Sequence, residues 1–135
     1  MELTTATLHE IMPFGALMEM LLVRASPEEV VATMEWREEI TTTAGAVHGG
    51  ALMALADTVG GAVAFLNLPE GAGTSTISSS TVFLRAAREG VVTATGRLVH
   101  RGRTTIVAET ELVGADGRPL CRTTQTQAVL LPRDG

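Results

Sequence analysis

The longest apolar stretch of the chain lies at residues 48–66 and consists mainly of Ala, Leu, Val, Met and Gly. Most of these residues favour helices, and Asn67, Pro69 and Gly71 after them are typical of a helix end. Because nearly every side of such a helix is apolar, we expect it to be buried on all sides, with a sheet packed against it. The polar, Thr-rich residues 38–46 predict a loop before it.

Segments rich in Val, Ile and Thr flank the predicted helix and have the pattern of strands. Two come before it and four after it, with tight turns at 101–103 and 115–117. We therefore expect an α+β fold in which one long helix is covered by an antiparallel sheet, with the last four strands in antiparallel succession. The predicted strands are residues 20–25, 30–36, 74–84, 91–100, 104–113 and 120–131, and a short helix interrupted by Pro13 is predicted at 7–18.

The composition narrows the chemistry of the chain. With 135 residues, of which 45 % are hydrophobic and 3 % aromatic, residues 1–135 are expected to form one domain with an aliphatic core. Tyrosine is absent, which excludes a tyrosine acid or nucleophile. The formal net charge of −5 is unfavourable for binding nucleic acid, because that function needs a dense basic surface.

Cysteine content and hydropathy indicate a cytoplasmic protein. The single Cys121 can form no internal disulfide and fits a reducing compartment. The first residues show no basic segment followed by an apolar run, so we expect no secretory signal. Residues 51–68 are long and apolar, but Asp57 and the Gly60-Gly61 pair lie inside them and no basic residues flank them. A core helix is therefore a better interpretation than a membrane span.

Asp57 is the strongest indication of chemistry, because it places a carboxylate in the middle of the apolar helix. Burial of an ionised carboxylate without a partner is costly. A hydrogen-bonded structural aspartate and a functional acid are both consistent with this position. Gly60 and Gly61 lie three and four residues later on the same helical face. They leave space beside the carboxylate for a ligand or for closely packed backbone.

His48-Gly49-Gly50 forms a second candidate site, at the predicted start of the helix. The first N–H groups of a helix have no intrahelical partner and carry a partial positive charge. Glycine lets an oxygen approach these amides closely, so this helix start is suited to polarising a carbonyl and stabilising an oxyanion. A plain Gly-rich helix start with His48 near the cap position is the alternative.

The spacing of the two candidate sites predicts a dimer. Gly49 and Asp57 are eight residues apart, so they lie on similar faces of the helix but about 12 Å apart along its axis. One carbonyl cannot contact both within a single helix. If both act on one substrate, the Gly49 amide of one chain must face the Asp57 of another. We therefore expect an obligate homodimer with two equivalent composite sites.

The run of residues 47–57, Val-His-Gly-Gly-Ala-Leu-Met-Ala-Leu-Ala-Asp, resembles the signature of the PaaI-type hotdog thioesterases, relatives from the phenylacetic acid pathway. In that family a His-Gly-Gly opens the central helix and an acidic residue follows two turns later. Phe-Leu-Arg at 83–85, Arg-Gly-Arg at 101–103 and Asp-Gly-Arg at 116–118 are similar to further elements of the family. The resemblance implies a hotdog fold and an acyl-CoA thioesterase without a cofactor.

The resemblance also implies roles for the candidate catalytic residues. Asp57 would attack the thioester or activate a water molecule, and sequence does not choose between the two. The Gly49 amide, helped by Gly50, would hold the carbonyl oxygen. His48 would orient the thioester or the helix start. Thr76 aligns where relatives carry a hydroxyl residue near the acid.

Substrate binding would involve three arginines and one departure from the family. Arg85, Arg101 and Arg103 would meet the coenzyme A phosphates, although an arginine of this kind is more often a solvated surface charge. Thr42 stands six residues before the histidine, where many relatives have an Asn. If that Asn positions water, this chain is altered at that point or uses a hydroxyl instead. Ala86 stands where the strand motif usually has Pro, which matters only to the turn.

The sequence thus predicts an enzyme that hydrolyses an acyl-CoA to a free acid and CoA. A hotdog protein that binds acyl-CoA without turnover is the alternative, kept open by Thr42. Hotdog dehydratases and hydratases pair a His with an acid in motifs that are absent from this sequence. The three histidines show no metal-ligand spacing, so no metal is expected.

The acyl group and the full assembly follow only from analogy. Relatives take aromatic or medium- to long-chain acyl groups, and a homotetramer built as a dimer of dimers is usual among them. We expect neither a membrane nor a nucleic acid as partner. Apolar residues that are candidates for an acyl pocket, though equally typical of a plain core, are Met12, Phe14, Met18, Met53 and Phe65.

Overall fold

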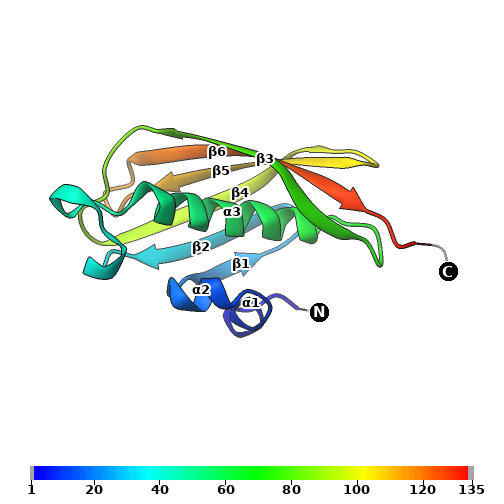
Figure 1. Cartoon of the computed structure of the whole chain (residues 1–135), viewed down its shortest axis with the longest axis horizontal. Helices are drawn as coiled ribbons and strands as arrows, with labels where there is room; N and C mark the ends of the chain where they lie inside the picture. The colour runs from blue at the N-terminus through cyan, green and yellow to red at the C-terminus, as the bar shows by residue number, and fades with distance from the viewer. Residues whose placement is uncertain (1, 134–135) are drawn as a thin grey trace.

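In the computed structural model, which describes residues 2–133, one long helix lies across the face of a six-stranded antiparallel sheet (Figure 1). The elements are α1 Thr5–Ile11, α2 Pro13–Leu17, β1 Leu21–Ala25, β2 Glu29–Glu35, the 3-10 turns η1 Glu38–Ile40 and η2 Thr43–Gly45, α3 Gly49–Phe65, β3 Gly73–Phe83, β4 Val91–Arg101, β5 Thr105–Val113 and β6 Pro119–Leu130. The strand order is β1-β2-β4-β5-β6-β3. The predicted α+β architecture is confirmed.

The sheet places β3 at an edge, which corrects the predicted antiparallel succession of the last four strands. β3 pairs with β6 along its whole length instead of with β4. Residues 84–90 therefore cross from this edge towards the middle of the sheet, and the Val47 N–H anchors them by donating to the Ala87 carbonyl at 2.8 Å. A tight turn makes consecutive strands pair, whereas a longer link such as residues 84–90 does not. The sequence therefore could not specify which strand pairs with β3.

Helix α3 is buried on one side only, so the expectation of burial on all sides is wrong. Leu55, Val59 and Val63 are fully buried. On the opposite side Met53 is 41 % exposed and Phe65 is 42 % exposed. An apolar pattern predicts that the surface of a helix is covered, but it does not identify the covering segment. The sheet of this chain covers only one side of α3. No helix within residues 2–133 is long and apolar enough to cross a membrane.

Strand β3 changes its inward face halfway along. A β-bulge between Thr76 and Ser78 makes Ile77 an extra residue relative to β6. Before the bulge Thr76 points to the helix side of the sheet, where it bonds a buried side chain of β6. After the bulge Phe83 points to the same side, and its ring lies against the first residue of α3. One strand therefore reaches both the middle and the start of α3.

Candidate active site

The Asp57 side chain borders a cavity of about 270 Å³ between α1, α3 and β3. Leu8 and Phe65 contribute to its apolar side, and Thr76 and Gln127 contribute to its polar side. Asp57 itself is exposed on the uncovered face of α3, so its side chain keeps contact with solvent and avoids the cost of full burial. The cavity therefore offers one ligand both an apolar wall and a carboxylate.

Gln125 was not predicted as a site residue, yet it makes the one side-chain hydrogen bond to Asp57 within residues 2–133. Its Nε2 donates to Asp57 Oδ1 at 2.8 Å, and its side chain is only 1 % exposed. The same nitrogen donates to Gln127 Oε1 at 3.2 Å. The signal that identifies both residues is their alternation on the inward face of β6, where a strand usually carries apolar side chains.

Thr76 lines the same cavity as Asp57 in the same chain. Its hydroxyl donates to Gln127 Oε1 at 2.5 Å, and Gln127 Nε2 donates to the Thr74 hydroxyl at 3.2 Å. The hydroxyl proton of Thr76 is thus committed to Gln127. Its oxygen accepts a long hydrogen bond of 3.5 Å from Gln125 Nε2 and keeps a second lone pair as an acceptor for a ligand or a water molecule. The structure brings the predicted hydroxyl residue and the predicted acid together.

At the start of α3 His48 caps the first turn, because its Nδ1 accepts the Gly50 N–H at 2.8 Å. A neutral His48 ring therefore carries its proton on Nε2. The Gly49 N–H is the first of the helix and makes no hydrogen bond within residues 2–133. A Cβ at Gly49 would lie only 3.3 Å from the Phe83 ring. Of the two predicted amide donors, Gly49 is therefore the one available to a carbonyl oxygen.

The helix start has a groove of its own, of about 310 Å³, and this groove shares no lining residue with the Asp57 cavity. Phe14 and Met18 line the groove, whereas Met12 and Phe65 line the Asp57 cavity. Four of the five predicted acyl-pocket residues are thus divided between two hollows along α3, and Met53 lines neither of them. This division agrees with the rise of about 12 Å between the two candidate sites.

Comparison with known proteins places this geometry in a family. Residues 44–121 match the family model described as the thioesterase superfamily. The chain belongs to this superfamily. It is 38 % identical over 113 residues to a predicted esterase from Deinococcus radiodurans, a match that covers 82 % of this chain and 70 % of the relative.

Solved thioesterase structures have the same fold as this superfamily member. A mutant of the thioesterase PA1618 from Pseudomonas aeruginosa gives a TM-score of 0.88 at 28 % identity and covers 96 % of both chains. A hypothetical thioesterase from Streptococcus pneumoniae, crystallised with coenzyme A, gives a TM-score of 0.82 at 30 % identity, covering 93 % of this chain and 99 % of that one. The hotdog fold is thereby confirmed, whereas membership of the PaaI subfamily stays a prediction.

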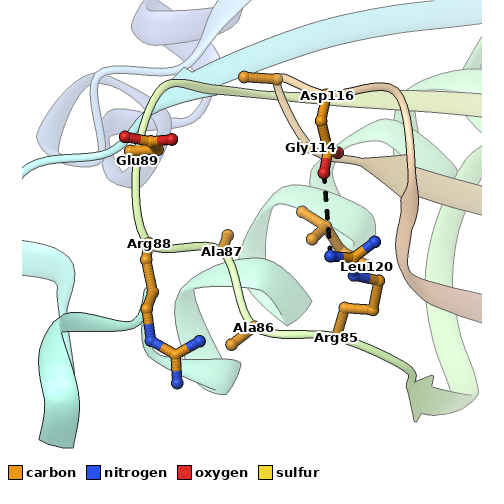
Figure 2. Close-up of a pocket in the computed structure, with 9 residues that line it drawn as sticks. Arg85, Ala86, Ala87, Arg88, Glu89, Gly114, Asp116 and Leu120 are labelled. Carbon is orange, nitrogen blue, oxygen red and sulfur yellow. Dashed lines mark ion pairs between the residues drawn. The ribbon is translucent and has the colours of Figure 1, made fainter.

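In this member of the thioesterase superfamily, the predicted phosphate-binding arginines lie at opposite ends of the sheet (Figure 1). Arg85 follows β3 near the start of α3, and its guanidinium lies 3.8 Å from the Asp116 carboxylate (Figure 2). The Arg118 N–H, followed by the Arg85 charge, holds the pKa of Asp116 below its ordinary value. Arg101 and Arg103 lie at the β4–β5 turn. A single chain does not bring the three together.

Two further expectations concern the loop before α3 and metal ligands. Thr42 has an exposed side chain, and its N–H donates to the Ala46 carbonyl at 2.7 Å. No hydrogen bond described for residues 2–133 joins Thr42 to Asp57. Over the same residues, no three His, Cys, Asp or Glu side chains are grouped closely enough to hold a metal ion.

Proposed function

We propose that this chain is an acyl-CoA thioesterase that hydrolyses its substrate to a free acid and CoA. The observation that carries the proposal is the Asp57 carboxylate, held by Gln125 at 2.8 Å beside a cavity with an apolar wall. A carboxylate in this position can activate water for attack on a thioester or attack the thioester itself, and an apolar wall suits an acyl group. Membership of the thioesterase superfamily and the coenzyme A bound to the S. pneumoniae relative support this substrate class.

In the general-base form of the reaction, Asp57 removes a proton from a water molecule while the water oxygen attacks the carbonyl carbon. The Thr76 oxygen accepts a hydrogen bond from that water. The carbonyl electrons move onto the oxygen, which the Gly49 N–H stabilises as an oxyanion. The double bond then re-forms, the C–S bond breaks, and the CoA sulfur takes the proton from Asp57. In the nucleophilic form Asp57 expels CoA by forming a mixed anhydride, which water then hydrolyses to the same acid.

A second copy of the chain would complete each site. β3 is an edge strand, and its Ile77 is 60 % exposed, so this edge is a surface that proteins usually cover. Antiparallel pairing of two β3 strands would set the Thr76 end of one strand beside the Phe83 end of the other. Asp57 of one chain would then approach the Gly49 amide of the other. We expect sedimentation to show a homodimer, or a homotetramer of two such dimers, and a monomer at assay concentrations would contradict the composite site.

The direct test of the function is thiol release from a panel of CoA esters. The panel compares aromatic acyl groups, phenylacetyl first, with medium and long aliphatic chains. Faster hydrolysis of the aromatic esters is expected if the chain follows the PaaI subfamily. Tight binding of CoA esters without thiol release from any of them would contradict the enzyme and indicate a non-catalytic acyl-CoA binding protein.

Cys121, the one cysteine of the chain, is expected not to react with the reagent of such a thiol assay. It is fully buried, and burial raises the pKa of its thiol to about 11. The thiolate is the reactive form, so near neutral pH the native protein should not react with an aromatic disulfide reagent. We expect about one thiol per chain to react only in denaturant. Rapid reaction of the native protein would contradict the burial of this part of β6.

Arg85→Ala is expected to raise the KM for a CoA ester about three- to tenfold with little change in kcat, because a surface charge contributes to binding and not to the reacting centre. Arg101→Ala, at the opposite end of the sheet, is the comparison that identifies which end holds the phosphates. An N-acetylcysteamine thioester lacks the nucleotide, so its KM should not respond to Arg85→Ala. An unchanged KM for the full CoA ester would remove Arg85 from the phosphate site.

A further inference from the structure

The side chain of Gln125 is buried in a way that packing alone does not explain. It is 1 % exposed, and its Oε1 has no hydrogen-bond partner within residues 2–133. A buried acceptor without a partner destabilises a fold, and an apolar side chain of the same size avoids that cost. Gln125 is therefore unfavourable for stability at this position, which suggests that its amide has another role.

The orientation of the Gln125 amide is set by Asp57. An ionised carboxylate only accepts hydrogen bonds, so the nitrogen of the amide faces it and not the oxygen. The same nitrogen reaches Gln127 Oε1, and that oxygen also accepts from Thr76. Rotation of the amide would break these two bonds and a longer one, of 3.5 Å, from the same nitrogen to the Thr76 hydroxyl oxygen. Asp57 is thus held at Oδ1, while within residues 2–133 no hydrogen bond engages its Oδ2.

Gly60 makes room for this amide. It lies three residues after Asp57 on α3 and is buried. A Cβ at this position would overlap Gln125 Oε1, whereas a Cβ at Gly61 would meet no atom within 4 Å. Glycine weakens a helix interior, so the close approach of the Gln125 carbonyl explains why this position is not alanine. The space that the sequence predicted beside the carboxylate is filled, at Gly60, by a side chain of β6.

We propose that Gln125 is a positioning residue for Asp57 and that Gly60 leaves the space in which the Gln125 amide lies. Gln125 fixes Asp57 through Oδ1 and leaves Oδ2 to act on water or on the thioester. It does not touch the reacting carbonyl and acts through the acid. The inference rests on the proposed thioesterase function. A misplacement of about 1 Å in a reacting group can cost about 100-fold in rate, so loss of this contact has a measurable effect.

Gln125→Leu is the first test, because leucine has a similar size and lacks the amide. We expect kcat to fall about 10- to 100-fold while KM for the same ester stays within about twofold. Tm should be unchanged or higher, since the unpaired carbonyl is removed together with the donor. A purely structural glutamine would give the opposite result, a lower Tm with normal kcat, and that result would overturn the proposal.

Thr123→Val is the matched control. Thr123 is buried on the same face of β6, and its hydroxyl bonds the Thr81 hydroxyl at 2.7 Å instead of a group at Asp57. The substitution therefore removes a buried polar group from the same strand without touching the acid. It should leave kcat unchanged, and a loss equal to that of Gln125→Leu would overturn the proposal.

Gly60→Ala disturbs the same contact while keeping Gln125. In the wild-type background it should lower kcat, because the added Cβ pushes the amide away from Asp57. In a Gln125→Ala background it should lower kcat no further, because no amide remains to be displaced. Losses that multiply in the double variant would show that Gly60 acts independently of Gln125. That result would overturn the proposal that Gly60 makes room for the Gln125 amide.

A measurement without turnover separates this inference from the proposed function. In ¹⁵N-labelled protein the side-chain NH₂ signals of Gln125, assigned by their absence in Gln125→Leu, should shift in Asp57→Ala and Gly60→Ala but not in Thr123→Val. Turnover by the wild type without these shifts would overturn the positioning role alone. If the signals shift as expected but no CoA ester releases thiol, the Gln125–Asp57 contact exists without catalysis. That result would overturn both the proposed function and a role for Gln125 in it.

Discussion

Asp57→Ala is expected to lower thiol release from the preferred CoA ester by about 10²- to 10⁴-fold, because the variant lacks both the base and the nucleophile. Asp57 is exposed on the uncovered side of α3, and alanine favours helices, so the fold should persist. Thiol detection measures kcat, and circular dichroism with thermal unfolding measures the fold. Normal turnover by a folded Asp57→Ala protein would exclude the proposed mechanism.

Asp57→Asn separates the charge of this side chain from its shape. The asparagine carbonyl can still accept the Gln125 N–H, so the contact to β6 is kept. The amide can neither take a proton from water nor form an anhydride. We expect Asp57→Asn to be about as inactive as Asp57→Ala. If it were much more active, the carboxylate would serve as a hydrogen-bond acceptor and not as the chemical group.

Activity restored by mixing two inactive variants is the second large effect that we expect, and Gly49→Pro supplies the partner variant. Proline at the first position of a helix is tolerated and removes the N–H. His48 before it has a ψ of 134°, which is the conformation that a following proline favours. Gly49→Pro should therefore fold while losing about 10²- to 10³-fold in kcat, the usual cost of one oxyanion donor.

Refolding Gly49→Pro together with Asp57→Ala should yield mixed dimers with one intact site each. That site combines the Gly49 amide of the Asp57→Ala chain with the Asp57 of the Gly49→Pro chain. With random pairing, about one quarter of wild-type activity should return, from two proteins that are each inactive. An activity equal to the average of the separate variants would place both groups in sites within single chains.

Gly49→Ala controls for crowding in this experiment. It keeps the N–H and places a Cβ 3.3 Å from the Phe83 ring, as proline does. Its loss in kcat measures the effect of pressure on Phe83 alone. If Gly49→Ala were as inactive as Gly49→Pro, the missing amide would not be the cause.

Local signals explain why the elements of the fold could be predicted from sequence. Strand alternation, tight turns and the helix-ending residues Asn67, Pro69 and Gly71 predict α3 and all six strands to within one residue at each end. These signals act between near neighbours in the chain. The position of β3 beside β6 and the uncovered side of α3 depend on distant segments, so the pattern of one strand or helix could not specify them.

The candidate site follows the same division. Asp57 and Gly49 are unusual within their own helix, so the sequence alone singles them out. Gln125 becomes informative only when β6 lies under the middle of α3, 68 residues from Asp57 along the chain. The arginines could be identified as candidates, but their separation along the sheet depends on where each strand ends.

The bulge at Ile77 sets a limit on how β3 can change its length. Thr76 and Phe83 are an odd number of residues apart, and in a regular strand such residues point to opposite faces. The extra residue shifts the phase of the strand, so that both side chains face α3. Substitutions at Ile77 keep this phase. Deletion of Ile77 would give β3 one regular alternation along its whole length. Either the Thr76 hydroxyl beside Asp57 or the Phe83 ring beside Gly49 would then point away from α3.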